Sequence, residues 1–420
     1  MHEEQPRPER KVSRRKVFYI PGYDPIHPRR YRELYRKEGA EQAGISGYDI
    51  ALSPRQGGTR YGWHVDAEVE GSRVHADVDV LVWSDIVRDS MAASIPATYL
   101  QLVRTAWTYI ATGALFRLMR LRKGPVIAAL YPVGMLLVQL AVALGLGVIV
   151  WRLVGLGVAL GAPEMAVTAI SAVAAVAVTV AVLRWFKGRD STFYAYYLMH
   201  DYAFSARWGG ANPPALEARM AEFGQAIEQA LVSDVDEVLV VGHSSGAHLA
   251  VSVLADLIRG GRVPDPNDTQ APALSFLSLG QVVPMMSFLP AAARLRGDLA
   301  FLSATDALAW VDITAPGDGC AFALCDPVGV SGVAPADQRW PIVFSAAFTQ
   351  TLSPERWRSL RWRFFRLHFQ YLCAFDRPHD YDYFRVTAGP RTLGARYEGR
   401  PSSKSAIRRA TSGYTSVAHP

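Results

Sequence analysis

Residues 237–257 read EVLVVGHSSGAHLAVSVLADL and combine the patterns of a strand, a turn and a helix. Its opening EVLVV is rich in aliphatic and β-branched residues, which is typical of a buried strand. The residues after Gly246 repeat apolar side chains at helical spacing. Between them, Gly242 and Gly246 leave room for the strand and the helix to approach closely. We therefore expect a sharp turn that holds Ser244 at its apex with the hydroxyl exposed.

This strand, turn and helix resemble the nucleophile elbow of the α/β-hydrolase superfamily, in which the motif GxSxG lies in the same structural context. The resemblance implies that Ser244 is a nucleophile and that the backbone amide of Ser245 is one oxyanion-hole donor. It also implies the chain order serine, acid, histidine, so that both partners follow Ser244. A glycine-rich turn without catalysis is the alternative interpretation.

Asp318 is the predicted acid. It lies in APGDGCAF, directly after the β-rich run LAWVDIT (308–314), at the loop position where the superfamily places its acid. The glycines on either side permit a tight turn. Asp312 lies inside the run and Asp326 lies further along the chain, so both are poorer candidates. An Asp that only stabilises the turn is the alternative for Asp318.

Three histidines follow Asp318 in the chain: His368, His379 and His419. The last of them lies in a segment that we expect to be disordered. His368 in RLHFQYL and His379 in DRPHDYDYF both follow the last β-rich run. We favour His368, because the aromatic residues around it can hold an imidazole rigidly, and keep His379 as the alternative base. The segment SPERWRSLRWRFFR (353–366) predicts an inserted helix that explains the long separation between acid and base.

A second oxyanion donor is expected after the early run KVFYI (16–20), where Pro21, Gly22 and Tyr23 follow. Gly22 lets this loop approach the nucleophile, and the Tyr23 N–H is predicted to point at the oxyanion. The sequence has no P-loop, no GxGxxG after a strand and no HExxH. We therefore expect neither a cofactor nor a metal.

Short β-rich runs alternate with helical segments, which predicts an α/β-hydrolase-like, mainly parallel sheet with helices on both faces. The helical pattern of 214–232 predicts a crossover helix ahead of the elbow. We expect the first part of the domain at 17–98 and the second part at 190–400. The six runs are 16–20, 79–83, 237–241, 273–280, 308–314 and 341–348.

Two uncharged runs interrupt this domain within residues 124–189. Residues 126–150 would form a helix about 37 Å long and residues 166–183 one of about 27 Å, against a hydrocarbon core of about 30 Å. We predict a transmembrane hairpin with spans at about 126–150 and 166–185, the alternative being two buried core helices.

Basic residues flank the hairpin on its outer sides, which predicts that both termini and the catalytic domain face the cytoplasm, at a bacterial-type inner membrane. The segment 99–123 is predicted to be one amphipathic interfacial helix, with core packing as the alternative. We expect a basic disordered arm at 1–16 and a disordered tail at 401–420. The outer basic residues are Arg117, Arg120, Arg122, Lys123, Arg184, Lys187 and Arg189, and the apolar positions of the interfacial helix are Leu100, Val103, Trp107, Ile110, Ala114, Leu118 and Leu121.

Composition agrees with these expectations. Half of the 420 residues are apolar and 20% are charged, which excludes a disordered chain. The net charge of +6 gathers near the predicted spans and in the first sixteen residues, so we interpret it as an orientation signal and expect no nucleic-acid partner. The three cysteines, Cys320, Cys325 and Cys373, are too few for a disulfide framework and are expected to be reduced.

The resemblance and the predicted hairpin together imply a membrane-anchored serine hydrolase that cleaves an ester, preferably a lipid or another amphiphilic acyl ester. The bilayer and such an ester are then its expected partners. An acyltransferase with the same triad and a non-catalytic membrane scaffold on a hydrolase fold are the alternatives. Neither the substrate nor the oligomeric state follows from the sequence.

Overall fold

The computed structural model describes residues 11–55, 60–157, 161–266 and 268–418. The chain divides into two compact units, which are described separately. The α/β unit contains residues 1–88, 112–125 and 208–420, and the helical unit contains residues 89–111 and 126–207.

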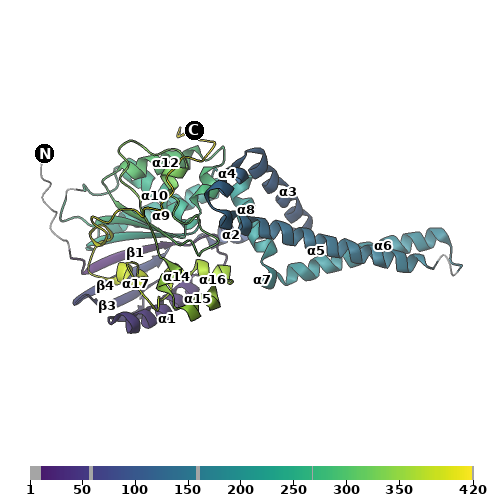
Figure 1. Ribbon diagram of the computed structural model, residues 1–420, viewed down its shortest axis with the longest axis horizontal. Coiled ribbons are helices and arrows are strands. Elements are labelled where there is room, and N and C mark those ends of the chain that lie inside the picture. The colour runs from purple at the N-terminus through teal and green to yellow at the C-terminus, as the bar shows by residue number, and fades with distance from the viewer. Residues whose placement is uncertain (1–10, 56–59, 158–160, 267, 419–420) are drawn as a thin grey trace. The chain divides into compact units, whose positions relative to one another are not determined.

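The α/β unit is built on an eight-stranded sheet in the order β2-β3-β4-β1-β5-β6-β7-β8 (Figure 1). Strands β4, β1, β5, β6, β7 and β8 run parallel, whereas β2, β3 and β4 form an antiparallel meander at one edge. The prediction of an α/β fold with a mainly parallel sheet is therefore confirmed. The strands are β1 (Arg14–Ile20), β2 (Asp49–Pro54), β3 (Gly62–Val69), β4 (Ser72–Val80), β5 (Glu237–His243), β6 (Ala273–Leu279), β7 (Ala309–Thr314) and β8 (Ile342–Ser345).

The edge meander is the part of the sheet that the β-rich runs did not predict. Only the end of β4 overlaps the predicted run 79–83, and β2 and β3 have no predicted counterpart. Apolar and polar residues alternate along β3, GWHVDAEV, and the alternate side chains are buried. An antiparallel edge strand covered on one face needs only this alternation, so it lacks the continuous apolar run of a central parallel strand.

Helices cover both faces of the sheet (Figure 1). Helices α9 (Pro214–Leu231), α10 (Gly246–Arg259) and α12 (Ala293–Ala304) lie on one face, and α1 (Arg29–Ser46) and α17 (Tyr383–Ala388) lie on the other. The predicted crossover helix is confirmed as α9. Its apolar stripe is buried as expected: Leu216, Met220, Phe223, Ile227 and Leu231.

The order of the parallel strands determines where a site can form. From β1 the chain first adds β4 on one side and then returns to add β5 on the other. The connections after β1 and β5 therefore leave the sheet in opposite directions, and such a switch point opens a crevice at the carboxyl ends of the strands. The loop Pro21–Tyr23 and the turn 242–246 both begin at these ends.

The helical unit contains two helices that are long and apolar enough to cross a membrane, α5 (Lys123–Gly155, whose first residues belong to the α/β unit) and α6 (Glu164–Gly188). In their most apolar windows only 22% and 17% of the residues are buried, whereas a core helix of a soluble protein would be mostly buried. They pack against each other as a hairpin (Figure 1). The contact is close at Gly147, where an added Cβ would lie 2.5 Å from Thr179 Oγ1. The unit also contains α3 (Ile95–Ala111), α7 (Asp190–Phe193) and α8 (Ala195–Arg207).

The prediction of one amphipathic helix over 99–123 is wrong. Gly113 adopts a left-handed conformation with φ of 71°, which ends α3 and starts a separate helix, α4 (Ala114–Leu121). The apolar stripe divides accordingly: Leu100, Val103, Trp107 and Ile110 on α3 are exposed, whereas Ala114, Leu118 and Leu121 on α4 are buried. The predicted boundary at 190 also moves, since α7 and α8 belong to the helical unit.

At the start of the chain, residues 1–10 of the predicted basic arm lie outside the described residues. The rest of that prediction is wrong, because Arg14, Arg15 and Lys16 belong to β1. The Arg15 guanidinium is buried against the Glu237 carboxylate at 2.5 Å, and Lys16 pairs with Asp79 at 2.9 Å. Buried acidic partners therefore allow these basic residues to belong to a strand, although their sequence is typical of a disordered basic terminus.

The predicted disorder of 401–420 is wrong for the described residues 401–418. This segment runs over the α/β unit, where the Ser403 N–H donates to Val343 O at 2.8 Å and the Ile407 N–H donates to Leu324 O at 2.7 Å. An extended segment that forms hydrogen bonds through its backbone needs no apolar periodicity. Its composition therefore did not predict that it is ordered.

Candidate active site

The predicted elbow is present at the carboxyl end of β5. Ser244 has φ of 56°, a left-handed conformation that a residue other than glycine rarely adopts. A Cβ on Gly246 would lie 2.1 Å from the Ile20 carbonyl oxygen, and one on Gly242 would lie 2.7 Å from Ala247 Cα. Both glycines are thus required by close packing, as the motif predicts, and they permit a half-buried serine at a strained apex.

Asp318 and His368, the predicted acid and base, lie in contact with each other. The His368 Nδ1 lies 2.7 Å from Asp318 Oδ2, and both side chains are buried. The Tyr371 hydroxyl donates to the same carboxylate oxygen at 3.0 Å, and the Cys320 N–H donates to Asp318 Oδ1 at 2.9 Å. This arrangement directs Nδ1–H to the acid and leaves Nε2 of His368 to accept a proton. The single inserted helix predicted over 353–366 is divided in the structure into two short helices, α15 (Pro354–Leu360) and α16 (Phe364–His368).

The surroundings of Asp318 keep it ionised. Burial alone would raise the pKa of Asp318, but its interaction with His368 and the hydrogen bonds from Cys320 and Tyr371 hold the pKa below its ordinary value. A carboxylate that stays charged can stabilise an imidazolium when His368 accepts a proton.

The end of β6 brings Ser244 and His368 to the same place. The Ser244 N–H donates to Leu279 O at 2.9 Å. The next residue, Gly280, has φ of 54°, and a Cβ there would lie 3.2 Å from His368 Cε1 and 2.7 Å from Tyr371 Cε2. Ser244 and His368 therefore border adjacent residues, Leu279 and Gly280, although they are separated widely in the sequence.

The other candidates lie elsewhere. His379 is exposed in a loop, whereas His368 contacts the acid. Asp312 lies inside β7, where it accepts a hydrogen bond from Ser278 at 2.6 Å and burial raises its pKa to about 8. Asp326 caps the short helix α13 (Pro327–Val330) through its side chain. His419 lies outside the described residues.

The loop after β1 lies against the elbow as predicted, but one of its amides is used differently. A Cβ on Gly22 would lie 3.0 Å from Ser244 Cβ, so only glycine allows this approach. The Tyr23 N–H, which we expected to point at an oxyanion, instead donates to Ser245 Oγ at 2.9 Å. The Tyr23 amide thus fastens the loop to the elbow, because the Ser245 hydroxyl lies within reach. The Ser245 amide stands at the start of α10, where the helix dipole favours negative charge.

His243 lies inside the elbow motif, and the sequence predicts only a structural role for it. Its Nε2 lies 3.0 Å from the carbonyl oxygen of His368, and the two rings lie 4.8 Å apart. Burial and the neighbouring His368 lower the pKa of His243 to about 3, so the ring stays neutral and Nε2–H can donate to that carbonyl. His243 thereby holds the backbone of His368.

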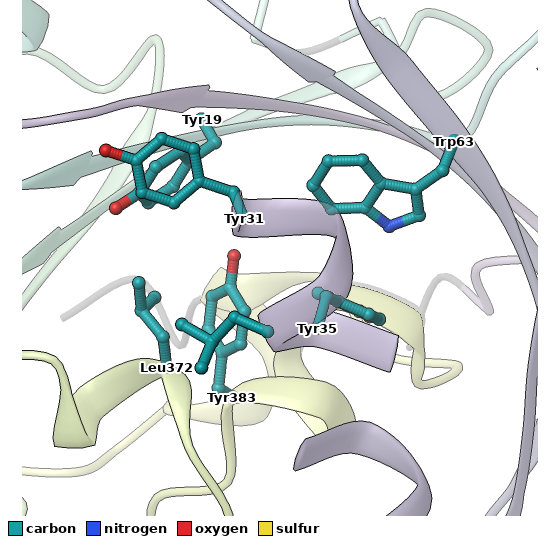
Figure 2. Close-up of a pocket in the computed structure, with 7 residues that line it drawn as sticks. Tyr19, Tyr31, Tyr35, Trp63, Leu372 and Tyr383 are labelled. Carbon is teal, nitrogen blue, oxygen red and sulfur yellow. The ribbon is translucent and has the colours of Figure 1, made fainter. Parts of the chain in front are cut away.

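The α/β unit also contains a small aromatic cavity (Figure 2). The Tyr19 ring is stacked on His243 with 6.4 Å between the ring centroids, and Tyr19 lines the cavity. The cavity has a volume of about 10 Å³, roughly the space for one water molecule, so it cannot hold an acyl chain. Its lining residues are Tyr19, Tyr31, Leu34, Tyr35, Trp63, Leu372 and Tyr383.

Asp318 and His368 also belong to a group of potential metal ligands. In the described part of the chain, Asp318, Cys320 and His368 offer ligand atoms that all lie within 4.8 Å of one another. Carboxylate, thiolate and imidazole together suit a zinc-like ion. Two of these atoms are already joined by the hydrogen bond between His368 and Asp318, so a metal would have to separate the pair.

Comparisons with known proteins identify no relative: no protein-family model matches the chain, and no curated protein or solved structure matches it. A functional interpretation therefore depends on the geometry of the site.

Proposed function

We propose that this protein is a membrane-anchored serine hydrolase that cleaves an acyl ester. The observation that carries the proposal is the position of Ser244, held at φ of 56° in a glycine elbow whose backbone bonds to the end of β6, beside the Asp318–His368 pair. Strained residues of this kind gather at active sites, and a serine needs an oriented base to become a nucleophile.

In the proposed reaction Ser244 Oγ attacks the ester carbonyl carbon while His368 Nε2 takes the hydroxyl proton. Asp318 stabilises the imidazolium through Nδ1–H. The Ser245 amide donates to the oxyanion of the tetrahedral intermediate. His368 then returns the proton to the leaving alcohol, and water hydrolyses the acyl-enzyme by the same steps in reverse.

We also propose that α5 and α6 cross the bilayer as a hairpin, with both termini and the catalytic unit on the cytoplasmic side of a bacterial-type inner membrane. The support is their length, their apolar composition and the basic residues that flank the hairpin. A catalytic unit tethered to a bilayer meets amphiphiles at its surface. A lipid or another amphiphilic acyl ester is therefore the substrate class that we favour.

A fluorophosphonate probe applied to isolated membranes tests the proposal. We expect the wild type to be labelled and Ser244→Ala to remain unlabelled. His368→Ala should reduce labelling by several orders of magnitude, whereas the matched variant His379→Ala should keep it, because only His368 contacts the acid. Folded wild-type protein that does not label would favour the non-catalytic scaffold and refute the hydrolase.

A further inference from the structure

An exposed run of arginine and aromatic residues precedes the base. Residues 361–366, RWRFFR, are called the arginine–aromatic patch here. Trp362 is 73% exposed and Phe364 is 51% exposed, and Arg361, Arg363 and Arg366 are exposed as well. Large aromatic side chains are costly to leave in water, and two of them alternating with three cations form a surface that fits a partner.

The three arginines of the patch are available for such a partner. Within the described ranges, no acidic side chain forms an ion pair with them, and Arg361 lies over the Trp362 ring at 5.6 Å. The preceding helix α15 differs, since Arg358 pairs with Glu355 at 3.0 Å. Among the described residues, therefore, no acidic side chain neutralises the charge of the patch.

The patch lies at the rim of the candidate site. A Cβ on Gly319, the residue after the acid, would lie 3.5 Å from the Phe364 ring. Gly319 also contacts Gly124, because a Cβ on Gly124 would lie 3.2 Å from the Gly319 carbonyl oxygen. Gly124 is the second residue of α5, whose apolar run begins two residues later. Within the α/β unit, the patch, the acid loop and the start of the apolar helix thus meet at Gly319.

We propose that the arginine–aromatic patch docks on an anionic lipid surface, with Trp362 and Phe364 at the headgroup level and the three arginines on lipid phosphates. Tryptophan is enriched at membrane interfaces, and clustered arginines beside a span bind anionic lipid. The inference rests on the proposed membrane anchoring and deepens it, because docking would hold the acid–base pair at the bilayer surface. Continuity with α5 favours a bilayer over an acidic protein or a nucleic acid, neither of which would need a place beside a span.

The test measures side-chain oxidation by hydroxyl radicals at Trp362 and Phe364 in the full chain, reconstituted in nanodiscs. We expect oxidation several-fold slower in discs of phosphatidylcholine with phosphatidylglycerol than in phosphatidylcholine alone. Three arginines near an anionic surface correspond to roughly a hundredfold in the docking equilibrium. Replacing Arg361, Arg363 and Arg366 together by Gln should therefore abolish the difference between the discs, and so should 1 M salt, where the Debye length is about 3 Å.

A matched control replaces three exposed arginines at the amino edge of the sheet, Arg14, Arg73 and Arg391, by Gln and should keep the protection. Equal oxidation in both discs would overturn the proposal, and so would protection by an oligonucleotide or by polyglutamate without protection by anionic discs. Ser244→Ala should show the wild-type footprint. A protein that docks but fails to label with the probe would therefore refute the hydrolase and leave the docking standing.

Discussion

Substitution of Gly280 by Ala tests whether His368 is the base. Gly280 follows β6 with φ of 54°. The new Cβ would lie 2.7 Å from Tyr371 Cε2 and 3.2 Å from His368 Cε1. Carbon atoms pack at about 3.5–4.0 Å, so the Tyr371 ring must retreat by roughly 1 Å and the imidazole by a few tenths of an ångström. The Tyr371 hydroxyl, which bonds to the acid, moves with its ring.

Two effects add up in this variant. An alanine in a left-handed conformation costs about 1–2 kcal/mol, and overpacking a buried site costs about 1–3 kcal/mol more. We therefore expect Gly280→Ala to lower the free energy of unfolding by about 2–5 kcal/mol. A displacement of about 1 Å in a catalytic constellation costs about a hundredfold in rate, so probe labelling should slow by about that factor.

Gly261→Ala is the matched control, because Gly261 also has a left-handed φ, of 63°, but nothing lies within 4 Å of its Cβ position. It should carry the conformational cost alone and keep wild-type labelling. Stability is measured by denaturant unfolding in detergent and labelling by the second-order rate with the fluorophosphonate. Labelling of folded Gly280→Ala within threefold of the wild type would refute the placement of the base beside this glycine.

Substitutions at three further residues test two hydrogen bonds beside the pair and one buried carboxyl group inside β7. Tyr371→Phe removes a donor from the buried Asp318 carboxylate, so the free energy of unfolding should fall by about 1–3 kcal/mol and labelling should slow; an unchanged unfolding curve would contradict the hydrogen bond. His243→Phe should slow labelling because the His368 carbonyl loses its donor, whereas His243→Gln, which can place an amide N–H near the same position, should restore part of the rate; equal rates for the two variants would exclude this positioning role. Burial raises the pKa of Asp312 to about 8, above an unfolded value near 3.9, so its contribution to stability is full below about pH 4 and is lost as the pH rises to 8. Thermal unfolding of Asp312→Asn should therefore depend less on pH over this window, and a variant that keeps the full wild-type pH dependence would show that Asp312 does not cause it.

The strongest predictions from the sequence are those whose signal is local. Ser244, Gly242 and Gly246 could be assigned because the strand, the turn and the helix are contiguous and each has its own residue pattern. The crossover helix α9 and the two long apolar helices were found for the same reason. Asp318 follows a strand directly, so its position at the sheet edge also follows from adjacent residues.

Other parts of the site depend on contacts between distant segments. The choice between His368 and His379 needed the hydrogen bond to Asp318, because both histidines follow the last strand. The sequence predicted that the Tyr23 N–H points at an oxyanion, whereas in the structure it donates to the Ser245 hydroxyl. The sequence signal for Gly280 was only a glycine at the end of a predicted strand.

The sequence predicted the strands β1, β5, β6, β7 and β8, the elbow around Ser244 and the two apolar helices, because burial periodicity and glycine sterics act over a few neighbouring residues. Contacts in the folded chain were needed to establish that the segment 401–418 is ordered, that His243 holds the backbone of His368, and that the arginine–aromatic patch meets Gly124 at Gly319. These features depend on hydrogen bonds and packing between residues far apart in the chain. No local pattern specifies such contacts, since any segment that reaches the right place can make them.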